Sequence, residues 1–115
     1  MVEIIIVPDE KTRAKKVSEL VEAVKEGKKI SKKIVIFTPE IFSQIFSTER
    51  IRLLLEIKTG KSVSITQLAG KVGRKFEAVH RDLKLFENYG LIKLTKKNKN
   101  VIPSMAEQIS IPVIA

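Results

Sequence analysis

The stretch from Ser64 to Asn100 constrains the fold of this chain more than any other part of its sequence. It begins with Ser-Ile-Thr-Gln at residues 64–67, a capping box whose serine and glutamine satisfy free amides at the start of a helix. Apolar residues then recur at helical spacing as far as Val72. Gly73 follows, and glycine adopts the left-handed conformation that closes a helix. The sequence therefore predicts a short helix that ends in a tight turn.

A second helix and a basic hairpin follow this turn. Val79, Leu83 and Phe86 repeat at helical spacing and place a helix over about residues 75–89, which Gly90 ends. Residues 91–94 leave as a strand, and residues 95–100 hold three lysines and two asparagines, a composition that favours an exposed turn. The hairpin tip has two interpretations, a solubilising turn or a DNA-binding wing. Its position after two helices favours the wing, and the whole arrangement is a winged helix-turn-helix.

The side chains that the second helix would turn outward are suited to DNA. A recognition helix reads bases with its N-terminal part while flanking basic groups hold phosphates. Ala78 allows close approach to the groove and can contact a thymine methyl group, and Arg81 can reach a guanine edge or a phosphate. The candidate DNA-binding residues are Ser64, Thr66, Arg74, Lys75, Ala78, His80, Arg81, Lys84, Lys96, Lys97, Asn98 and Lys99.

The second helix starts without an ordinary cap. Arg74 or Lys75 stands where Ser, Thr, Asp or Asn would usually accept a backbone N–H, an omission that costs about 1 kcal/mol. Positive charge at a helix N-terminus also opposes the helix dipole. A nearby phosphate would offset both effects, so this violation indicates a polyanionic partner.

The distribution of charge supports the same interpretation. The chain has 22 Lys and Arg against 13 Asp and Glu, for a net charge of +9. Residues 41–115 hold 13 of the basic residues and six of the acidic ones, whereas residues 1–40 hold nine and seven. The positive excess therefore lies with the helix-turn-helix half, as the electrostatic footprint of a DNA-binding protein should.

Composition argues against catalysis, metal binding and insertion in a membrane. There is no cysteine, so the chain has no disulfide, thiolate metal site or catalytic thiol. His80 is the only histidine, which excludes a site of several histidines and leaves ordinary surface placement, which is favoured, or a role in pH sensing or contact with a base. We find no nucleophile-base pair and no glycine-rich phosphate loop, and we expect no enzyme activity and no cofactor. No apolar stretch approaches the roughly 18 residues that span a bilayer, and no signal peptide is recognisable, so we expect a cytoplasmic protein.

Residues 1–37 are expected to form a strand-helix-strand extension that serves dimerisation. Residues 2–7 have the length and apolarity of a strand, and Asp9 can cap a helix that ends near Gly27. Residues 34–37 form a second strand, which the long crossover would allow to pair in parallel. Two strands alone are marginal, so a third should come from the chain's own C-terminus or from a second subunit. The predicted apolar stripe of the helix consists of Ala14, Val17, Leu20, Val21 and Val24.

Residues 38–115 are expected to form the winged helix-turn-helix region together with a C-terminal strand, which makes the fold α+β. Thr38-Pro39 is a strong helix start, and a further helix should begin at residues 47–49. Residues 109–113 alternate as a half-buried strand, and Pro112 marks that strand as an edge or a strand end. The predicted core side of the helix after residue 49 holds Ile51, Leu54, Leu55 and Ile57, with Arg50 and Arg52 outside.

Three further side chains of the second helix, Phe76, Asp82 and Glu87, have expected positions. Phe76 can be a wedge toward DNA, although packing against Leu68 or Val72 is the favoured interpretation. Asp82 and Glu87 are expected to form ion pairs on the helix surface, each worth a few tenths of a kcal/mol.

The chain resembles a family of small archaeal winged-helix transcriptional regulators related to the MarR and ArsR groups. The resemblance rests on Phe-Thr-Pro-Glu at residues 37–40, Ser-Thr-Glu-Arg-Ile-Arg-Leu-Leu at 47–54, Val-His-Arg-Asp-Leu at 79–83 and Leu-Phe-Glu-Asn-Tyr-Gly-Leu-Ile at 85–92. It covers nearly the whole chain, with residues 1–33 the loosest part. The asparagine-rich wing and Arg74-Lys75-Phe76 depart from the family pattern. The resemblance implies sequence-directed binding to double-stranded DNA by a homodimer on a two-fold site.

Three classes of function are therefore compared. The favoured one is a DNA-binding transcriptional regulator, with the helix at about residues 75–89 in the major groove and the wing at 95–100 on the backbone or in the minor groove. The alternative is a protein-interaction module of a transcription or replication complex, because winged helices also bind proteins. An enzyme is the third, and no residue pattern supports it. The sequence does not identify a small-molecule effector.

Overall fold

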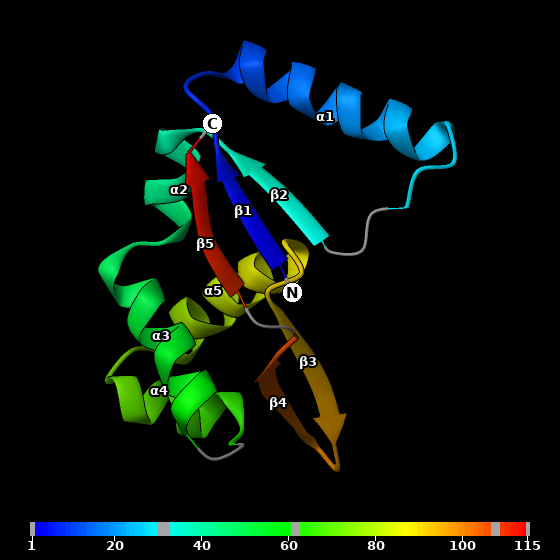
Figure 1. The fold of residues 1–115 in the computed structure, drawn as a ribbon. Helices are drawn as coiled ribbons and strands as arrows, with labels where there is room; N and C mark the ends of the chain where they lie inside the picture. Colours follow the sequence, from blue (N-terminus) through cyan, green and yellow to red (C-terminus); the bar gives the residue numbers. More distant parts are fainter. Residues whose placement is uncertain (1, 30–32, 61–62, 107–108, 115) are drawn as a thin grey trace. The chain divides into compact units, whose positions relative to one another are not determined.

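A computed structural model describes residues 2–29, 33–60, 63–106 and 109–114. The chain separates into two compact units, Met1–Gln44 with Gln108–Ala115, and Ile45–Glu107. Figure 1 labels the elements, which in chain order are β1 (Val2–Ile6), α1 (Glu10–Lys25), β2 (Lys33–Phe37), α2 (Pro39–Ile45), α3 (Thr48–Thr59), α4 (Ile65–Val72), α5 (Phe76–Asn88), β3 (Ile92–Lys97), β4 (Asn100–Met105) and β5 (Ile109–Ile114).

The first unit is built on a parallel sheet with the strand order β2-β1-β5. Ile5 on β1 pairs with Ile36 on β2, and the next residue of β1, Ile6, pairs with Ile114 on β5 (Figure 1). Both β1 and β2 are strongly apolar, as strands of a parallel sheet usually are. The predicted parallel pairing is confirmed, and the third strand comes from the chain's own C-terminal segment.

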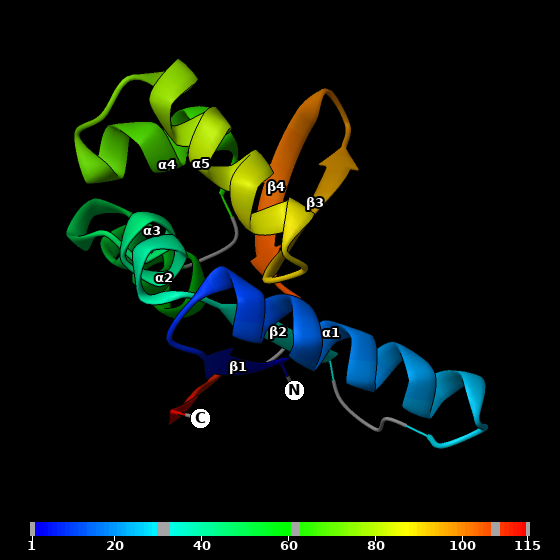
Figure 2. The same ribbon diagram turned by 90° about the horizontal axis from the view of Figure 1, so that it is seen from above.

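Helix α1 crosses one face of this sheet. Asp9 caps its start by accepting the backbone N–H of Thr12 at 2.7 Å, as predicted. Leu20 packs against a cluster of Ile5, Val7 and Ile36. Figures 1 and 2 show the C-terminal half of α1 extending past β2, beyond the strands.

The predicted apolar stripe of α1 is wrong as a description of the core. None of its residues is buried, and Val17, Val21 and Val24 are 39%, 47% and 54% exposed. The side of α1 that lies on the sheet is instead formed by Leu20 and by polar side chains such as Arg13, whose Nε donates to the carbonyl of Ile36 at 2.9 Å. The valines do lie on one side of α1, as their spacing predicts, but that side is exposed. The sheet covers the side that carries Arg13 and Leu20.

The units also differ from the expected division at residues 37 and 38. Strand β5 pairs with β1, so residues 109–114 belong with the N-terminal sheet instead of the winged helix. Most of α2 also lies in the first unit. Its start is the predicted one, because Thr38 Oγ1 accepts the backbone N–H of Ile41 at 3.3 Å and Pro39 is the first helical residue.

The second unit packs α3, α4 and α5 with the two-stranded sheet of β3 and β4, which confirms the predicted winged helix-turn-helix core. Its fully buried side chains include Leu53, Leu68, Leu83, Phe86 and Leu91. The prediction for α3 is partly wrong. Leu53 and Leu54 face the core, whereas Ile51 and Leu55 are 41% and 53% exposed, because α4 and β4 cover a different side of the helix from the one expected.

The turn between α4 and α5 has the predicted chemistry. Ser64 Oγ accepts the backbone N–H of Gln67 at 3.2 Å, and Gln67 Oε1 accepts the backbone N–H of Ser64 at 3.1 Å. Gly73 takes a left-handed φ of 67°, and the N–H of Arg74 donates to the carbonyl of Ala69 at 3.0 Å. This 6→1 bond is that of a Schellman motif, which stops α4 and turns the chain into α5.

The same motif ends α5 and starts the hairpin. Gly90 takes a φ of 72°, and the N–H of Leu91 donates to the carbonyl of Phe86 at 2.9 Å. Strands β3 and β4 then pair antiparallel, and the pairing of Lys97 with Asn100 leaves two residues for the turn. The first of these, Asn98, has a φ of 58°, a left-handed conformation that asparagine tolerates better than most residues.

Across the described residues, no helix combines the length and the apolarity that crossing a membrane would require.

Candidate nucleic-acid interface

The candidate interface is the outward side of α5 together with the hairpin of β3 and β4, both in the second unit (Figure 1). Val79, Leu83 and Phe86 are completely buried and fix which side of α5 faces the core. The opposite side carries the exposed residues Glu77, Arg81 and Lys84, with Ala78 and His80 half-buried beside them, and Lys75 is exposed at the N-cap. Helix α5 therefore presents cations around a small residue, as its sequence predicts.

The start of α5 lacks a side-chain cap. Lys75 occupies the N-cap position in an extended conformation and makes no capping hydrogen bond. The first amides of a helix have no partner within the helix, and the helix dipole places partial positive charge there. Exposed Lys75 adds positive charge beside these amides and Glu77 in the first turn offsets part of it, so the free amides are the groups at this end that can bind an anion.

Arg74 is placed differently from the other candidates. Its side chain is only 17% exposed, and Nη2 lies 2.8 Å from Oδ2 of Asp82 and 3.8 Å from Oε2 of Glu49. Its charge is therefore balanced by carboxylates of the protein. A phosphate could therefore compensate the charge of Lys75 at the helix start, whereas the charge of Arg74 is already compensated.

Asp82 is the centre of a buried ionic cluster, and the prediction that it forms a surface pair is wrong. Its side chain is 2% exposed, and Oδ1 accepts a hydrogen bond from Nε of Arg50 at 3.1 Å. The contact with Arg74 is short but its angle is not that of a hydrogen bond, and Nη1 of Arg74 finds no hydrogen-bond partner among the described residues. The cluster connects α3, the turn before α5 and α5 itself. Arg50 therefore does not lie on the outer side of α3, where it was expected.

Phe76 is also placed differently from the favoured prediction. It is 44% exposed, so it does not complete the core beside Leu68 or Val72. Its ring stacks on that of His80, with 5.8 Å between centroids and 16° between the planes. The two rings form one aromatic edge at the N-terminal end of α5.

Two other basic side chains of α5 differ in their freedom. Nζ of Lys84 lies 3.3 Å from Oε1 of Glu87, one turn further along the helix. Glu87 therefore forms the predicted surface pair. Arg81 is exposed and makes no ion pair within the described ranges. The guanidinium of Arg81 is thus more available to a ligand than the amine of Lys84.

The residues at the start of α4 have separate environments. Ser64 uses its hydroxyl to cap the helix and is half-buried, so little of it is available to a partner. Thr66 is exposed.

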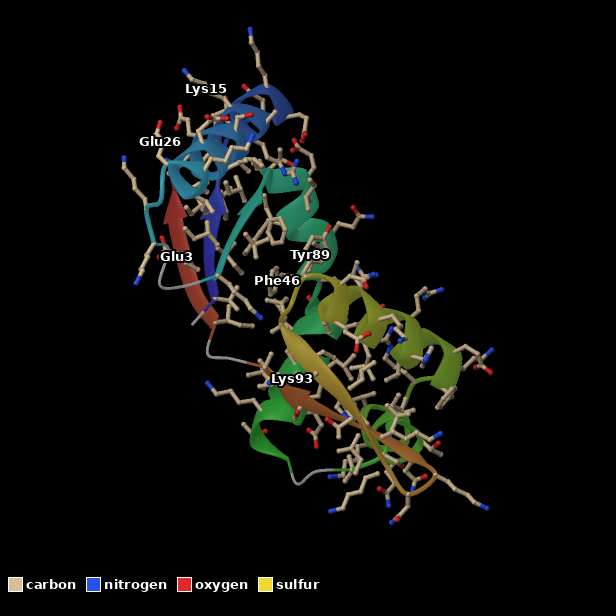
Figure 3. The ribbon with its side chains drawn as sticks, turned by 90° about the vertical axis from the view of Figure 1, so that its right-hand side faces the viewer. Glu3, Lys15, Glu26, Phe46, Tyr89 and Lys93 are labelled. Carbon is tan, nitrogen blue, oxygen red and sulfur yellow. The ribbon has the colours of Figure 1, made fainter. Side chains whose placement is uncertain are left out.

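The wing is a row of exposed amines. Lys96, Lys97, Asn98 and Lys99 are all exposed, and none of the three lysines has an acidic partner in the part of the chain that the structure describes. Lys93, which was not among the predicted residues, is exposed on β3 and is labelled on that strand in Figure 3. The alternation of Ile92, Lys93 and Leu94 along the strand was the signal that could have identified it.

The described ranges contain no cluster of three or more side chains suited to holding a metal ion. The interface thus consists of amines, one guanidinium, an aromatic pair and a helix end, which are groups that bind anions and bases.

One known protein family matches the part of the chain that contains this interface. The model of family HVO_A0114 matches residues 45–109, which is more than half of the chain and includes α3 through β4. The chain belongs to family HVO_A0114. No curated protein sequence matches it.

Solved structures share the fold at low sequence identity. The solution structure of the homodimeric winged helix-turn-helix DNA-binding domain of Mb0332 from Mycobacterium bovis is 12% identical, with a TM-score of 0.55 over 80% of this chain and 71% of that one. NolR from Sinorhizobium fredii is 15% identical, with a TM-score of 0.54 over 80% and 77%. The transcriptional regulator HlyU from Vibrio vulnificus is 13% identical, with a TM-score of 0.51 over 81% and 84%. These likenesses establish the winged-helix fold.

Proposed function

We propose that this protein is a DNA-binding transcriptional regulator that recognises double-stranded DNA sequence through α5. The observation that carries the proposal is the grouping of unpaired cations on α5 and the wing beside an uncapped helix start. A helix of this kind fits the major groove with its N-terminal end toward the bases, while a basic hairpin holds the backbone or enters the minor groove.

Each candidate residue has a role in this proposal. Lys75 and the wing lysines neutralise phosphates, while Arg81 contacts either a phosphate or a guanine edge. Ala78 and His80 lie where α5 would approach the base edges, and they supply discrimination between bases. Thr66, Asn98 and Lys84 are assigned to contacts with the DNA backbone. Ser64 and Arg74 are given lesser roles, because one caps α4 and the other is engaged with Asp82.

The comparisons support this proposal. Mb0332 is described as a homodimeric DNA-binding domain, and HlyU as a transcriptional regulator. By analogy we propose that this chain acts as a homodimer on a two-fold DNA site, that its first unit serves dimerisation, and that it is a cytoplasmic protein without enzyme activity. The archaeal origin and the MarR likeness remain predictions.

The alternative function is a protein-interaction module whose lysines meet an acidic protein surface. The exposed Ile51 and Leu55 on α3 favour it, because apolar side chains on a basic domain can dock a protein. The two functions differ in what the wing lysines contact.

A salt titration of binding to duplex DNA tests the proposal. The logarithm of the affinity should fall linearly with that of the salt concentration, with a slope close to the number of neutralised phosphates. Changing Lys96, Lys97 and Lys99 to Gln should flatten the slope by about one unit for each lysine that contacts a phosphate.

The matched control replaces Lys11 and Lys15 of α1 and Lys28 after it with Gln, which removes the same charge from exposed positions of the first unit. Its slope should stay close to that of the unchanged protein. Absence of duplex binding at low salt would refute the proposed function. Equal slopes for the two triple variants would refute the role of the wing.

A further inference from the structure

We infer that the exposed stripe of α1, defined as Ala14, Val17, Val21 and Val24, is the surface through which two copies of this chain associate, with the two α1 helices antiparallel. This inference rests on the homodimer of the proposed function and names its interface. Its occupant is a second copy of the same stripe.

Helix α1 leaves its apolar side uncovered. The helix has 16 residues and none is buried, although Val17, Val21 and Val24 lie on one side of it. Helices in proteins owe most of their stability to burying such a side, and a helix alone in water is marginal at this length. The exposed fraction rises along the helix, from 39% at Val17 to 54% at Val24. The stripe therefore has the chemistry of an unfilled interface.

The spacing of the stripe also suits the packing of two helices side by side. Its four residues follow one another at intervals of three, four and three, which is the spacing of the seam between two helices packed side by side. Small and β-branched side chains at these positions let two helices approach closely. The same spacing in a second copy makes the surface complementary to itself, as a two-fold interface requires.

The sheet of the first unit, in contrast, offers poor edges for pairing with a second copy. On the outer side of β2, the carbonyl of Ile36 already accepts the hydrogen bond from Nε of Arg13. On the opposite edge, β5 contains Pro112, which has no N–H to donate. Both edges are therefore blunted against strand addition.

The orientation follows from charge. Glu10 continues the stripe at the N-terminal end of α1, and Lys25 borders it at the C-terminal end. Each is held by a neighbour on its own helix, Glu10 by Arg13 at 3.0 Å and Lys25 by Glu22 at 3.7 Å. An antiparallel pair brings the acidic end of each stripe to the basic end of the other and opposes the two helix dipoles favourably. A parallel pair would instead align the two helix dipoles unfavourably.

Sedimentation equilibrium of the full chain without DNA tests the inference. The unchanged protein should be dimeric, and the double variant V17K/V21K should raise the dissociation constant of the dimer at least roughly tenfold, because ammonium groups would have to be desolvated in the interface. The control E19K makes the same change in net charge on a side of α1 about 160° from Val21, and it should leave the dissociation constant unchanged. Circular dichroism checks that both variants fold.

Disulfide cross-linking tests the orientation in the otherwise unchanged chain, which contains no cysteine. Ser18 borders the middle of the stripe, so S18C should cross-link two copies of an antiparallel pair. Ala14 lies near one end of the stripe, so A14C should cross-link only a parallel pair. Cross-linking of A14C without S18C would overturn the antiparallel arrangement.

The outcomes separate this inference from the proposed function. A monomeric unchanged protein, or a dimer that V17K/V21K leaves intact, overturns the inference even if the protein binds DNA. A dimer that V17K/V21K dissociates supports the inference even if no duplex is bound, in which case the proposed function fails alone.

Discussion

The two longest helices, α1 and α5, are both amphipathic, yet they use their apolar sides in opposite ways. Helix α5 buries Val79, Leu83 and Phe86 completely and turns its charges outward, whereas α1 buries none of its residues and leaves a row of valines exposed. The difference shows what helical periodicity can establish. It identifies an apolar side, but the rest of the structure decides whether the chain itself covers that side.

The largest effect on stability is expected when one apolar side chain is shortened on each helix, which tests whether α1 and α5 differ in the burial of their apolar sides. Phe86→Ala should lower the free energy of unfolding by about 3–5 kcal/mol, because it leaves a cavity in the core of the second unit. Val21→Ala should change the free energy of unfolding by less than about 0.5 kcal/mol in monomeric protein, because Val21 is already half exposed. Denaturant unfolding at low protein concentration measures both, and similar losses would show that α1 is covered within one chain.

A somewhat smaller loss is expected for the ionic cluster that holds α5. Asp82→Ala leaves Arg50 and Arg74 without their buried carboxylate and should cost about 3 kcal/mol, the lower end for breaking a buried pair, since Arg74 retains some contact with water. Glu87→Gln, which removes only the exposed pair with Lys84, should cost less than about 0.5 kcal/mol. If the two variants unfold at the same denaturant concentration, the cluster does not stabilise α5.

The smallest effect concerns the helix starts, where α1 has a titratable cap and α5 has none. The backbone amide of Thr12, and then its side chain, hold the pKa of Asp9 below its ordinary value. A group with a lowered pKa in the folded state stabilises the fold fully above its unfolded pKa of about 3.9 and loses that contribution as the pH falls through the lower folded value. The start of α1 should therefore fray below about pH 4.

Asp9→Asn separates this cap from other acid effects. Asparagine still accepts the N–H of Thr12 but does not titrate, so α1 should keep its helicity to lower pH than in the unchanged chain. Circular dichroism between neutral pH and pH 2 follows the change. An identical pH profile for D9N would exclude Asp9 as the group that titrates.

The features that were predicted correctly are those that a few neighbouring residues determine. The capping box at Ser64, the glycine turns at residues 73 and 90, and the uncapped start at Lys75 are all present. Each depends on backbone conformation and on side chains within one turn of helix. The parallel pairing of β1 with β2 joins residues 31 positions apart, but it was predicted from the length of the connection, which the sequence shows directly.

The features that were missed depend on residues distant in sequence. Asp82 resembles any surface acid until Arg50, 32 positions earlier, is brought against it. Phe76 has the spacing of a core residue but lies one turn before the buried part of α5. The choice between Leu53 and Leu55 on α3 is made by the elements that pack on it. Sequence periodicity contains none of this information.

The cluster around Asp82 also bears on how much order a DNA partner would have to impose. Charged contacts of 2.8 and 3.1 Å join α3, the turn and α5. They fix the orientation of α5 in the protein alone, before any DNA is bound. A binding helix that is already immobile loses little conformational entropy in the complex, so more of its contact energy remains as affinity. Asp82, which would contact no DNA base, would then affect binding by keeping α5 rigid. A substitution of Asp82 that makes α5 more mobile would appear as a more unfavourable entropy of association.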